Sequence, residues 1–381
     1  MASSSAAAWN IKGVMPKKIT ILVVDDSALI RRSLNHMLKD VDFIDSVHSV
    51  SNGKEGIYWT MRLKPDVVLL DLEMPEMNGF SFLRWLMRNH PVPCIVISSA
   101  DSRENILRSF ELGAVDFIAK PDLQLKRKYA LLDDIRNRLL RKIATVSQLH
   151  VTNQTINGLC DQDTLEKAKT RQAIDETIDL SRVAVCFIGA STGGPGIIAR
   201  LLRHLPAAFP VPILVGIHMP KYFTRTFAQR LAAISPLEVL EARNRLSLIP
   251  GRVIVAKGGY HLKVRKQKFQ PLVLLEPEQD TAKYVPSLDS MLLSLAESYF
   301  DRVLSIILTG MGDDGLTGVS KLKQLGTITI TQKAESCIVY GMPRAIAEKG
   351  LSDMALDVEE IQYLLQRLVT VQKKQHNTTL S

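Results

Sequence analysis

Short apolar runs alternate with amphipathic stretches along this chain of 381 residues, and no other feature of the sequence constrains its fold as strongly. Between residues 18 and 146, five apolar runs are each followed by a stretch with apolar residues at helical spacing. Strands that alternate with helices in this way predict an α/β domain with a doubly wound parallel sheet. The expected strands are Thr20–Val24, Asp45–Val50, Val67–Leu70, Cys94–Ile97 and Val115–Ile118.

A second alternating pattern begins at Arg182 and predicts another doubly wound α/β domain. Within it, residues 251–264 contain two apolar runs on either side of Gly258 and Gly259. A glycine pair between two such runs predicts a β-hairpin. The expected strands of this domain are Val183–Ile188, Ile213–Ile217, Val253–Ala256, Leu262–Val264, Val303–Leu308 and Thr327–Thr331.

These two patterns divide the chain into five parts. The N-terminal stretch is rich in Ala and Ser and lacks the apolar core of a signal peptide, so we expect a disordered leader. The stretch between the domains is polar, as is typical of a linker. The parts are a leader at 1–17, a first domain at 18–146, a linker at 147–181, a second domain at 182–370 and a tail at 371–381.

Composition narrows the class of protein further. No apolar run approaches the roughly 18 residues that a membrane span needs, and the linker contains no helix-turn-helix pattern for reading DNA. None of the four cysteines belongs to a C-x-x-C pair, which favours reduced thiols. We therefore expect a cytoplasmic protein that neither inserts into membranes nor binds nucleic acid, and whose net charge of +9 suits an acidic protein partner.

Acidic residues follow two of the strands expected in the first domain. Asp25 and Asp26 end the first strand, and Asp71 ends the third. Because parallel strands end at one edge of the sheet, three carboxylates should converge there and repel one another. A hard divalent cation, most naturally Mg²⁺, relieves that repulsion. A helix cap would explain any one of these aspartates alone, but Ser98 and Lys120 bring further polar groups to the ends of the fourth and fifth strands.

In the second domain, Ser191 lies in the turn GASTGG (189–194), between an apolar run and a helical pattern. A serine on such a strand-to-helix turn is typical of a hydrolase nucleophile. The alternative is a loop that binds phosphate. No Walker lysine follows the glycines, which argues against ATP binding.

A nucleophilic serine needs a base and an acid. His218 follows the strand expected at 213–217, which places it at the same sheet edge as Ser191. Asp313 and Asp314 follow the strand expected at 303–308; either carboxylate could orient the imidazole while the other caps the next helix. The resulting order Ser, His, Asp differs from the Ser, Asp, His order of typical α/β-hydrolases.

The segments ILVVDDS (21–27), LDLEMP (70–75) and FIAKP (117–121) resemble the two-component receiver family. This resemblance spans about residues 18–141 and implies a flavodoxin-like fold. It implies that Asp71 is the phosphoacceptor and that Phe117 is the aromatic switch residue. It also implies that Ser98 and Lys120 contact the phosphoryl group, and that Mg²⁺ is held by Asp25, Asp26, Asp71 and the backbone carbonyl of Glu73.

The segments GASTGG (189–194), IHMP (217–220), LTGMGDDG (308–315) and YGMP (340–343) resemble the catalytic domain of CheB-type chemotaxis methylesterases. The resemblance spans about residues 182–355 and implies a Ser191, His218 and Asp314 triad that needs no cofactor. It also implies that the backbone N–H of Met311 contributes to the oxyanion hole. The geometry of the turn after a nucleophile adds the N–H of Thr192.

A receiver followed by this catalytic domain is the CheB architecture. It implies a phosphorylation-regulated serine hydrolase that demethylates glutamyl methyl esters, and deamidates glutamines, on chemoreceptors. A CheA-type histidine kinase is the implied phosphodonor, and we expect the unphosphorylated receiver to cover the Ser191 cleft. Two alternatives are a receiver-controlled hydrolase of another acyl substrate and a non-catalytic response regulator. The chain departs from the family at Val285, where a basic residue is common, and in its long linker.

Overall fold

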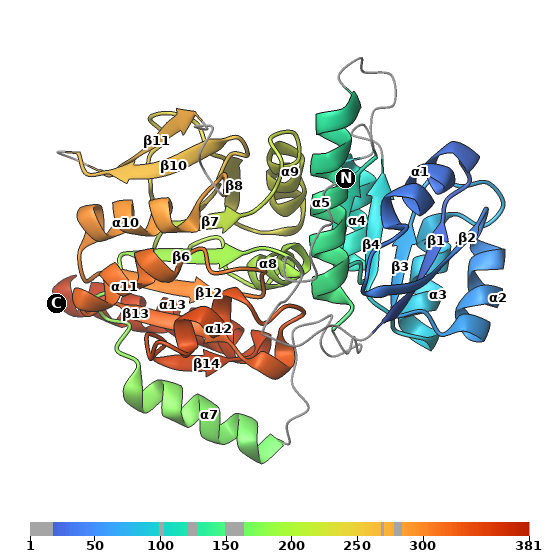
Figure 1. The fold of residues 1–381 in the computed structure, drawn as a ribbon. Helices are drawn as coiled ribbons and strands as arrows, with labels where there is room; N and C mark the ends of the chain where they lie inside the picture. Colours follow the sequence, from blue (N-terminus) through green and yellow to red (C-terminus); the bar gives the residue numbers. More distant parts are fainter. Residues whose placement is uncertain are drawn as a thin grey trace. The chain divides into compact units, whose positions relative to one another are not determined.

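The computed structural model describes residues 18–98, 103–120, 128–148, 164–267, 270–277 and 284–380. The leader predicted at 1–17 and the first half of the predicted linker, residues 149–163, lie outside the described residues. The chain forms two compact units, residues 1–156 and 157–381, and most of their elements are labelled in Figure 1. The boundary between the units falls within the predicted linker.

The first unit contains a five-stranded parallel sheet with strand order β2-β1-β3-β4-β5. Its strands and helices are β1 (Ile19–Val24), α1 (Ala28–Leu38), β2 (Ile44–Val50), α2 (Gly53–Leu63), β3 (Val67–Leu70), α3 (Gly79–Asn89), β4 (Cys94–Ser98), α4 (Arg103–Glu111), β5 (Asp116–Ala119) and α5 (Lys128–Val146). The side chains of β3 and β4 are buried on both faces of the sheet, as expected where helices cover both sides. The predicted five-stranded doubly wound sheet is confirmed.

The second unit is built on a seven-stranded parallel sheet with strand order β14-β13-β12-β6-β7-β9-β8. Its strands are β6 (Val185–Ala190), β7 (Ile213–Ile217), β8 (Glu238–Glu241), β9 (Arg252–Val255), β12 (Val303–Ile307), β13 (Ile328–Gln332) and β14 (Met354–Leu356). Its helices are α7 (Thr164–Thr177), α8 (Gly194–Arg203), α9 (Thr224–Ile234), α10 (Leu288–Tyr299), α11 (Leu316–Gln324), α12 (Met342–Ala347) and α13 (Val358–Leu380), with a short 3₁₀ turn, η2 (Ala334–Ser336). The predicted doubly wound α/β domain is confirmed.

The β-hairpin of the second unit is formed by β10 (Tyr260–Arg265) and β11 (Leu272–Pro277), which pair antiparallel. The prediction of a hairpin over 251–264 was wrong in its first strand. That strand, β9, pairs in parallel with β7 and β8 in the large sheet, because Val253, Ile254 and Val255 are all fully buried and require cover on both faces. The two glycines at 258 and 259 therefore lead out of the large sheet and into the hairpin.

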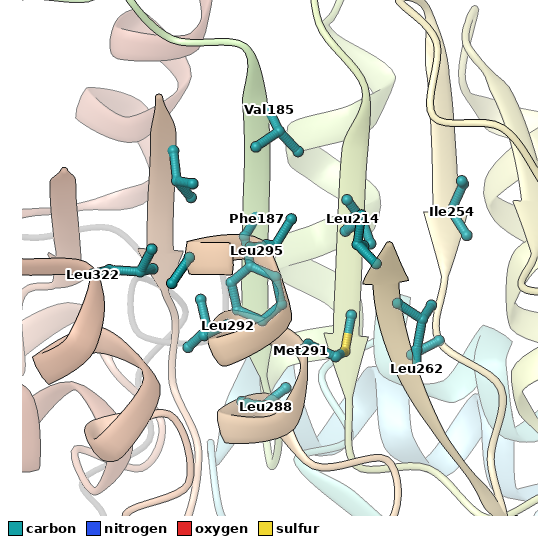
Figure 2. Close-up of a cluster of buried hydrophobic side chains, with 14 of the residues drawn as sticks. Val185, Phe187, Leu214, Ile254, Leu262, Leu288, Met291, Leu292, Leu295 and Leu322 are labelled. Carbon is teal, nitrogen blue, oxygen red and sulfur yellow. The ribbon is translucent and has the colours of Figure 1, made fainter. Parts of the chain in front are cut away.

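Helix α10 is the centre of the hydrophobic core that covers one face of the large sheet (Figure 2). A β-carbon on Gly216 of β7 would lie 2.3 Å from Leu288 Cδ2, so the glycine lets α10 lie directly against the strand. Burial of each large apolar side chain here contributes about 1.5–3 kcal/mol. This packing fixes the N-terminus of α10 above the ends of β6 and β7. The fully buried residues drawn in Figure 2 include Phe187, Leu288, Met291, Leu292 and Leu295.

The second half of the predicted linker forms helix α7, which packs on α13. Lys167 Nζ lies 2.8 Å from Glu359 Oε2, Tyr363 donates its hydroxyl to Asp175 at 2.8 Å, and Ile174 is fully buried. This part of the linker therefore has a fixed place on the second unit. None of the helices in the described ranges combines the length and the apolar composition of a membrane span.

Candidate active site

Ser191 lies in the tight turn between β6 and α8. Its backbone N–H donates to the Thr309 carbonyl at 3.1 Å, and its carbonyl accepts from the N–H of Gly194 at 2.9 Å. Gly193 adopts φ +81°, a left-handed conformation that suits glycine. A β-carbon on Gly194 would lie 2.4 Å from Ala190 Cβ, so a side chain there would push α8 away from β6. These glycines therefore hold the serine at the end of its strand, as the sequence predicted.

His218 occupies the corresponding position on the neighbouring strand. Ala190 and Ile217 are paired across β6 and β7, so Ser191 and His218 each follow one member of that pair. His218 Nε2 lies 2.9 Å from Asp314 Oδ2, and its side chain is 14% exposed. Since Nε2 faces the carboxylate, Nδ1 is the ring nitrogen that remains to accept a proton. No hydrogen bond joins Ser191 Oγ to the imidazole within the described part of the chain.

Asp314 is the acidic residue that the structure brings to His218. It is buried, whereas Asp313 is exposed. Besides the imidazole, its carboxylate accepts the N–H of Leu288 at 2.7 Å and that of Asp289 at 3.0 Å. These donors form the first turn of α10, where the helix dipole favours a negative charge. Burial alone would raise the pKa of Asp314. The contact with His218 and these N–H donors outweigh burial and hold the pKa of Asp314 below the ordinary aspartate value of 3.8.

Asp289 makes the reciprocal contact. Its Oδ1 accepts the N–H of Gly315 at 3.1 Å and that of Gly318 at 2.7 Å, at the start of α11. Asp314 thus binds the N-terminus of α10, which contains Asp289, and Asp289 binds the N-terminus of α11, which follows Asp314. Burial, with a smaller contribution from the nearby Asp314 carboxylate, raises the pKa of Asp289 above 3.8. This pair of caps fixes the direction of the Asp314 carboxylate.

Tyr284 is a site residue that the sequence did not indicate. Its ring stacks on the His218 imidazole, with centroids 4.7 Å apart and planes inclined by 8°. A β-carbon on Gly312 would lie 2.3 Å from the Tyr284 hydroxyl, so the ring also reaches the loop after β12. Tyr284 lies outside any regular element, and neither strand nor helix periodicity marks it. Only its place two residues before the PSLD segment (286–289) could have drawn attention to it.

The two backbone groups predicted for the oxyanion hole follow Ser191 and Gly310. A β-carbon on Gly310 would lie 2.8 Å from Ser191 Cβ, so the segment leading to Met311 passes directly against the serine. Thr309 is fully buried and donates its hydroxyl to the Thr192 carbonyl at 3.0 Å. This hydroxyl ties the turn after Ser191 to the loop after β12. The role of the Thr192 and Met311 N–H groups stays a prediction.

The first unit brings its acidic residues together as predicted. One carboxylate oxygen from each of Asp25, Asp26 and Asp71 lies within 4.8 Å of the others. Lys120 Nζ lies 2.6 Å from Asp71 Oδ2 and 3.0 Å from Asp25 Oδ2. Burial raises the pKa of Asp71 above 3.8, although the bond from Lys120 opposes the shift. Asp25 Oδ2 is buried, and its partner in the described residues is Lys120. This oxygen-rich set fits Mg²⁺.

The remaining residues predicted for this site lie around the same strand ends. Ser98 is buried at the end of β4. Glu73 donates its N–H to Asp71 Oδ1 at 3.3 Å and accepts from Asn105 Nδ2 at 3.1 Å. Phe117 packs edge-on against Phe110, with ring centroids 6.1 Å apart. Their roles in binding the metal ion, the phosphoryl group and the switch stay predictions.

Known families match both units in the same order. Residues 21–128 match the response regulator receiver domain, and residues 186–365 match the CheB methylesterase. A protein-glutamate methylesterase/protein-glutamine glutaminase of Geobacter sulfurreducens is 37% identical over 358 residues, which cover 91% of this chain and 96% of the relative. A protein of the same name from Anaeromyxobacter dehalogenans is 38% identical over 350 residues, which cover 91% of this chain and 94% of the relative.

Among solved structures, the CheB methylesterase catalytic domain of Thermotoga maritima is similar, with 37% identity and a TM-score of 0.48. The match covers 49% of this chain and 99% of that domain. The relatives at 37–38% identity extend over both units of the chain. This chain therefore belongs to the CheB family, the protein-glutamate methylesterases/protein-glutamine glutaminases that carry a response regulator receiver domain.

Proposed function

We propose that this protein hydrolyses methyl esters of glutamyl side chains on chemoreceptors, and deamidates glutamines there, in chemotactic adaptation. The observation that carries the proposal is the 2.9 Å contact between His218 Nε2 and Asp314 Oδ2. His218 follows β7, the strand next to β6, and Ser191 follows β6. A base oriented by a buried carboxylate beside a serine on a tight turn suits acyl transfer. The names of the relatives support the choice of a glutamyl ester and a glutamine as substrates.

In the proposed reaction, Ser191 Oγ attacks the ester carbonyl while His218 accepts the hydroxyl proton at Nδ1. The Asp314 carboxylate stabilises the imidazolium that forms, and the imidazolium then protonates the departing methoxide, which leaves as methanol. Water enters, His218 removes its proton, and hydrolysis of the acyl-enzyme releases the glutamate. A glutamine follows the same path and loses ammonia.

The tetrahedral intermediates carry a negative charge on the former carbonyl oxygen. The N–H groups of Thr192 and Met311 are the proposed donors to this oxygen. Loss of one such donor costs about 10²–10³ in rate in a serine hydrolase. The buried hydroxyl of Thr309 supports both donors indirectly, because it holds the turn after Ser191 against the loop after β12.

Control is proposed to reside in the first unit, with Asp71 as the phosphoacceptor and a CheA-type histidine kinase as the donor. Mg²⁺, held by Asp25, Asp26, Asp71 and the Glu73 carbonyl, would neutralise charge on the incoming phosphoryl group. Lys120 already contacts two of these carboxylates and would bind a phosphoryl oxygen. We propose that the unphosphorylated receiver inhibits the esterase, and that phosphorylation shifts the population toward an active state.

The test is methanol release from methylated receptor membranes, with and without a small phosphodonor. Wild type should release methanol faster with the donor, Asp71→Ala should not respond to it, and Ser191→Ala should release none. A Ser191→Ala variant that retains activity would exclude the proposed nucleophile. A donor effect of equal size in Asp71→Ala would exclude the proposed control site. Soluble, cytoplasmic fractionation in the source cell is expected for a protein with this substrate.

A further inference from the structure

Basic and aromatic side chains gather after the strand that precedes His218 and after the neighbouring strand, on two loops and at the start of β10. Lys221 and Tyr222 follow β7, and Lys257 and Tyr260 follow β9, the strand beside it. We refer to these four residues as the Lys221–Lys257 patch. Because β7 and β9 are parallel, the patch lies at the same edge of the sheet as the proposed base.

The backbone holds the two loops of the patch together. A β-carbon on Gly258 would lie 2.7 Å from Lys221 Cα, so the loops touch where glycine leaves room. The N–H of Gly258 also donates to Thr224 Oγ1 at 3.1 Å, at the start of α9. The Thr224 hydroxyl in turn donates to Glu241 Oε1 at 2.6 Å, so this nearby carboxylate already has a hydrogen-bond partner. The patch is therefore a preformed surface, and its shape does not depend on long side chains alone.

The charges of the patch are not neutralised within the described residues. Lys221 Nζ and Lys257 Nζ lie 5.9 and 4.8 Å from the centroid of the same Tyr260 ring, yet no carboxylate in the described ranges forms an ion pair with either. Lys263, in the adjoining hairpin, does have such a partner, Glu276, at 2.7 Å. The two ammonium groups around the Tyr260 ring repel each other, and a cation–π contact at an exposed site stabilises by only about 0.5–1 kcal/mol. An acidic group bound between them would therefore relieve the repulsion.

We propose that the Lys221–Lys257 patch binds an acidic segment of the protein substrate, next to the glutamyl ester that enters the active site. This inference rests on the proposed function and adds a determinant of substrate choice to it. Each hydrolysis turns a neutral ester into a carboxylate, so a receptor that has already lost some of its methyl esters carries negative charge near the esters that remain. Tyr222, which is 62% exposed, offers an aromatic surface for the same segment.

The alternative interpretation is that Lys221 and Lys257 are solvated surface lysines that bind no part of the substrate. The two interpretations differ in what they predict for large and small substrates. A docking patch assists a protein substrate that spans it and does nothing for a small neutral ester that reaches only Ser191. The attraction should also weaken with salt, because the Debye length is about 10 Å at 0.1 M ionic strength.

The test compares kcat/KM of the full-length double variant Lys221→Glu/Lys257→Glu on methylated receptor membranes and on a neutral aryl acetate. We expect a fall of tenfold or more on the receptor, and a change of less than threefold on the aryl acetate. The matched control is Lys321→Glu/Lys349→Glu, which changes net charge equally at exposed lysines outside the patch. It should change neither value by more than threefold.

A second variant, Tyr222→Ala, removes contact area without a change in charge, and we expect it to lower only receptor turnover. An equal fall on both substrates, or an equal fall in the control pair, would overturn the docking proposal. Unchanged receptor turnover in both patch variants would also overturn it. Failure of the proposed function is distinguishable, because wild-type protein would then release no methanol from receptor membranes.

Discussion

Replacement of Asp314 by asparagine should damage both the chemistry and the packing of the second unit. The carboxylate receives four donors, two on each oxygen: the imidazole and the Leu288 N–H on Oδ2, and the Ser287 hydroxyl and the Asp289 N–H on Oδ1. Asparagine has one acceptor oxygen, so in either orientation its NH₂ group faces two donors. Hydrogen bonds to a charged group are worth about 1.5–3 kcal/mol each. The Ser287 contact is long, at 3.2 Å, and contributes less. We therefore expect the free energy of unfolding to fall by about 2–5 kcal/mol.

Two assays on the same preparation test this expectation for Asp314→Asn. For a domain of 150–250 residues, such a loss lowers Tm by roughly 5–15 °C, which calorimetry of the full-length protein detects in the transition of the second unit. The rate of methanol release should fall by about 10⁴, because the imidazole loses the carboxylate that fixes its tautomer. The matched control is Asp313→Asn, at the exposed neighbouring residue, and both values should remain close to wild type.

The two assays refute different parts of the reasoning. Activity of Asp314→Asn within tenfold of wild type would show that another group orients His218. An unchanged Tm would show that the carboxylate does not stabilise the start of α10. Damage of equal size in Asp313→Asn would mean that neither effect belongs to the buried carboxylate.

Three further predictions concern neighbouring features of the same unit. Tyr284→Leu should lower kcat by roughly 3–30-fold with KM little changed, since an aromatic face stabilises a cation, here the His218 imidazolium, by about 0.5–2 kcal/mol. The kcat of Tyr284→Phe should be close to that of wild type. An equal loss in both variants would instead assign the effect to the hydroxyl. Gly194→Ala should lower the free energy of unfolding of the unit by about 1–3 kcal/mol in denaturant titrations, because its β-carbon would lie 2.4 Å from Ala190 Cβ. An unchanged free energy of unfolding would disprove that tight contact. The lowered pKa of Asp314 means that the unfolded chain binds the proton first, so wild-type stability should fall as pH drops from about 4 to the native pKa of Asp314. Denaturant titrations should show a shallower fall in Asp314→Asn, and parallel curves would contradict the assignment.

Most of the architecture could be predicted because buried parallel strands leave a strong mark in the sequence. Runs such as VVLL (67–70) and VCFIG (185–189) are apolar on both faces. The two strands of the large sheet that were missed, β8 and β14, are short and lie at its edges. Their side chains are only partly buried, so the apolar run that marks a central strand is absent. The hairpin was misplaced because β9 precedes a glycine pair, although Val253, Ile254 and Val255 are fully buried in the large sheet.

The candidate site was predictable where residues follow strands and not where they lie between elements. Ser191, His218 and Asp71 each come directly after an apolar strand, and topology brings strand ends to one edge. Periodicity carries no information about Tyr284, which reaches His218 from an irregular segment. Strand position alone did not separate the two adjacent aspartates, because both follow β12. The family resemblance favoured Asp314, and its burial and its contact with His218 support that choice.

Because Asp314 and Asp289 cap each other's helices, the acid of the proposed triad also links the start of α10 to the start of α11. Its carboxylate points at His218 only while α10 begins at Leu288, and α10 lies there only because its apolar side chains are packed on β6 and β7. A chain that has formed its strands but has not docked this helix has the serine and histidine without an oriented acid. We therefore expect hydrolytic activity to be lost as soon as α10 separates from the sheet, before the rest of the unit unfolds.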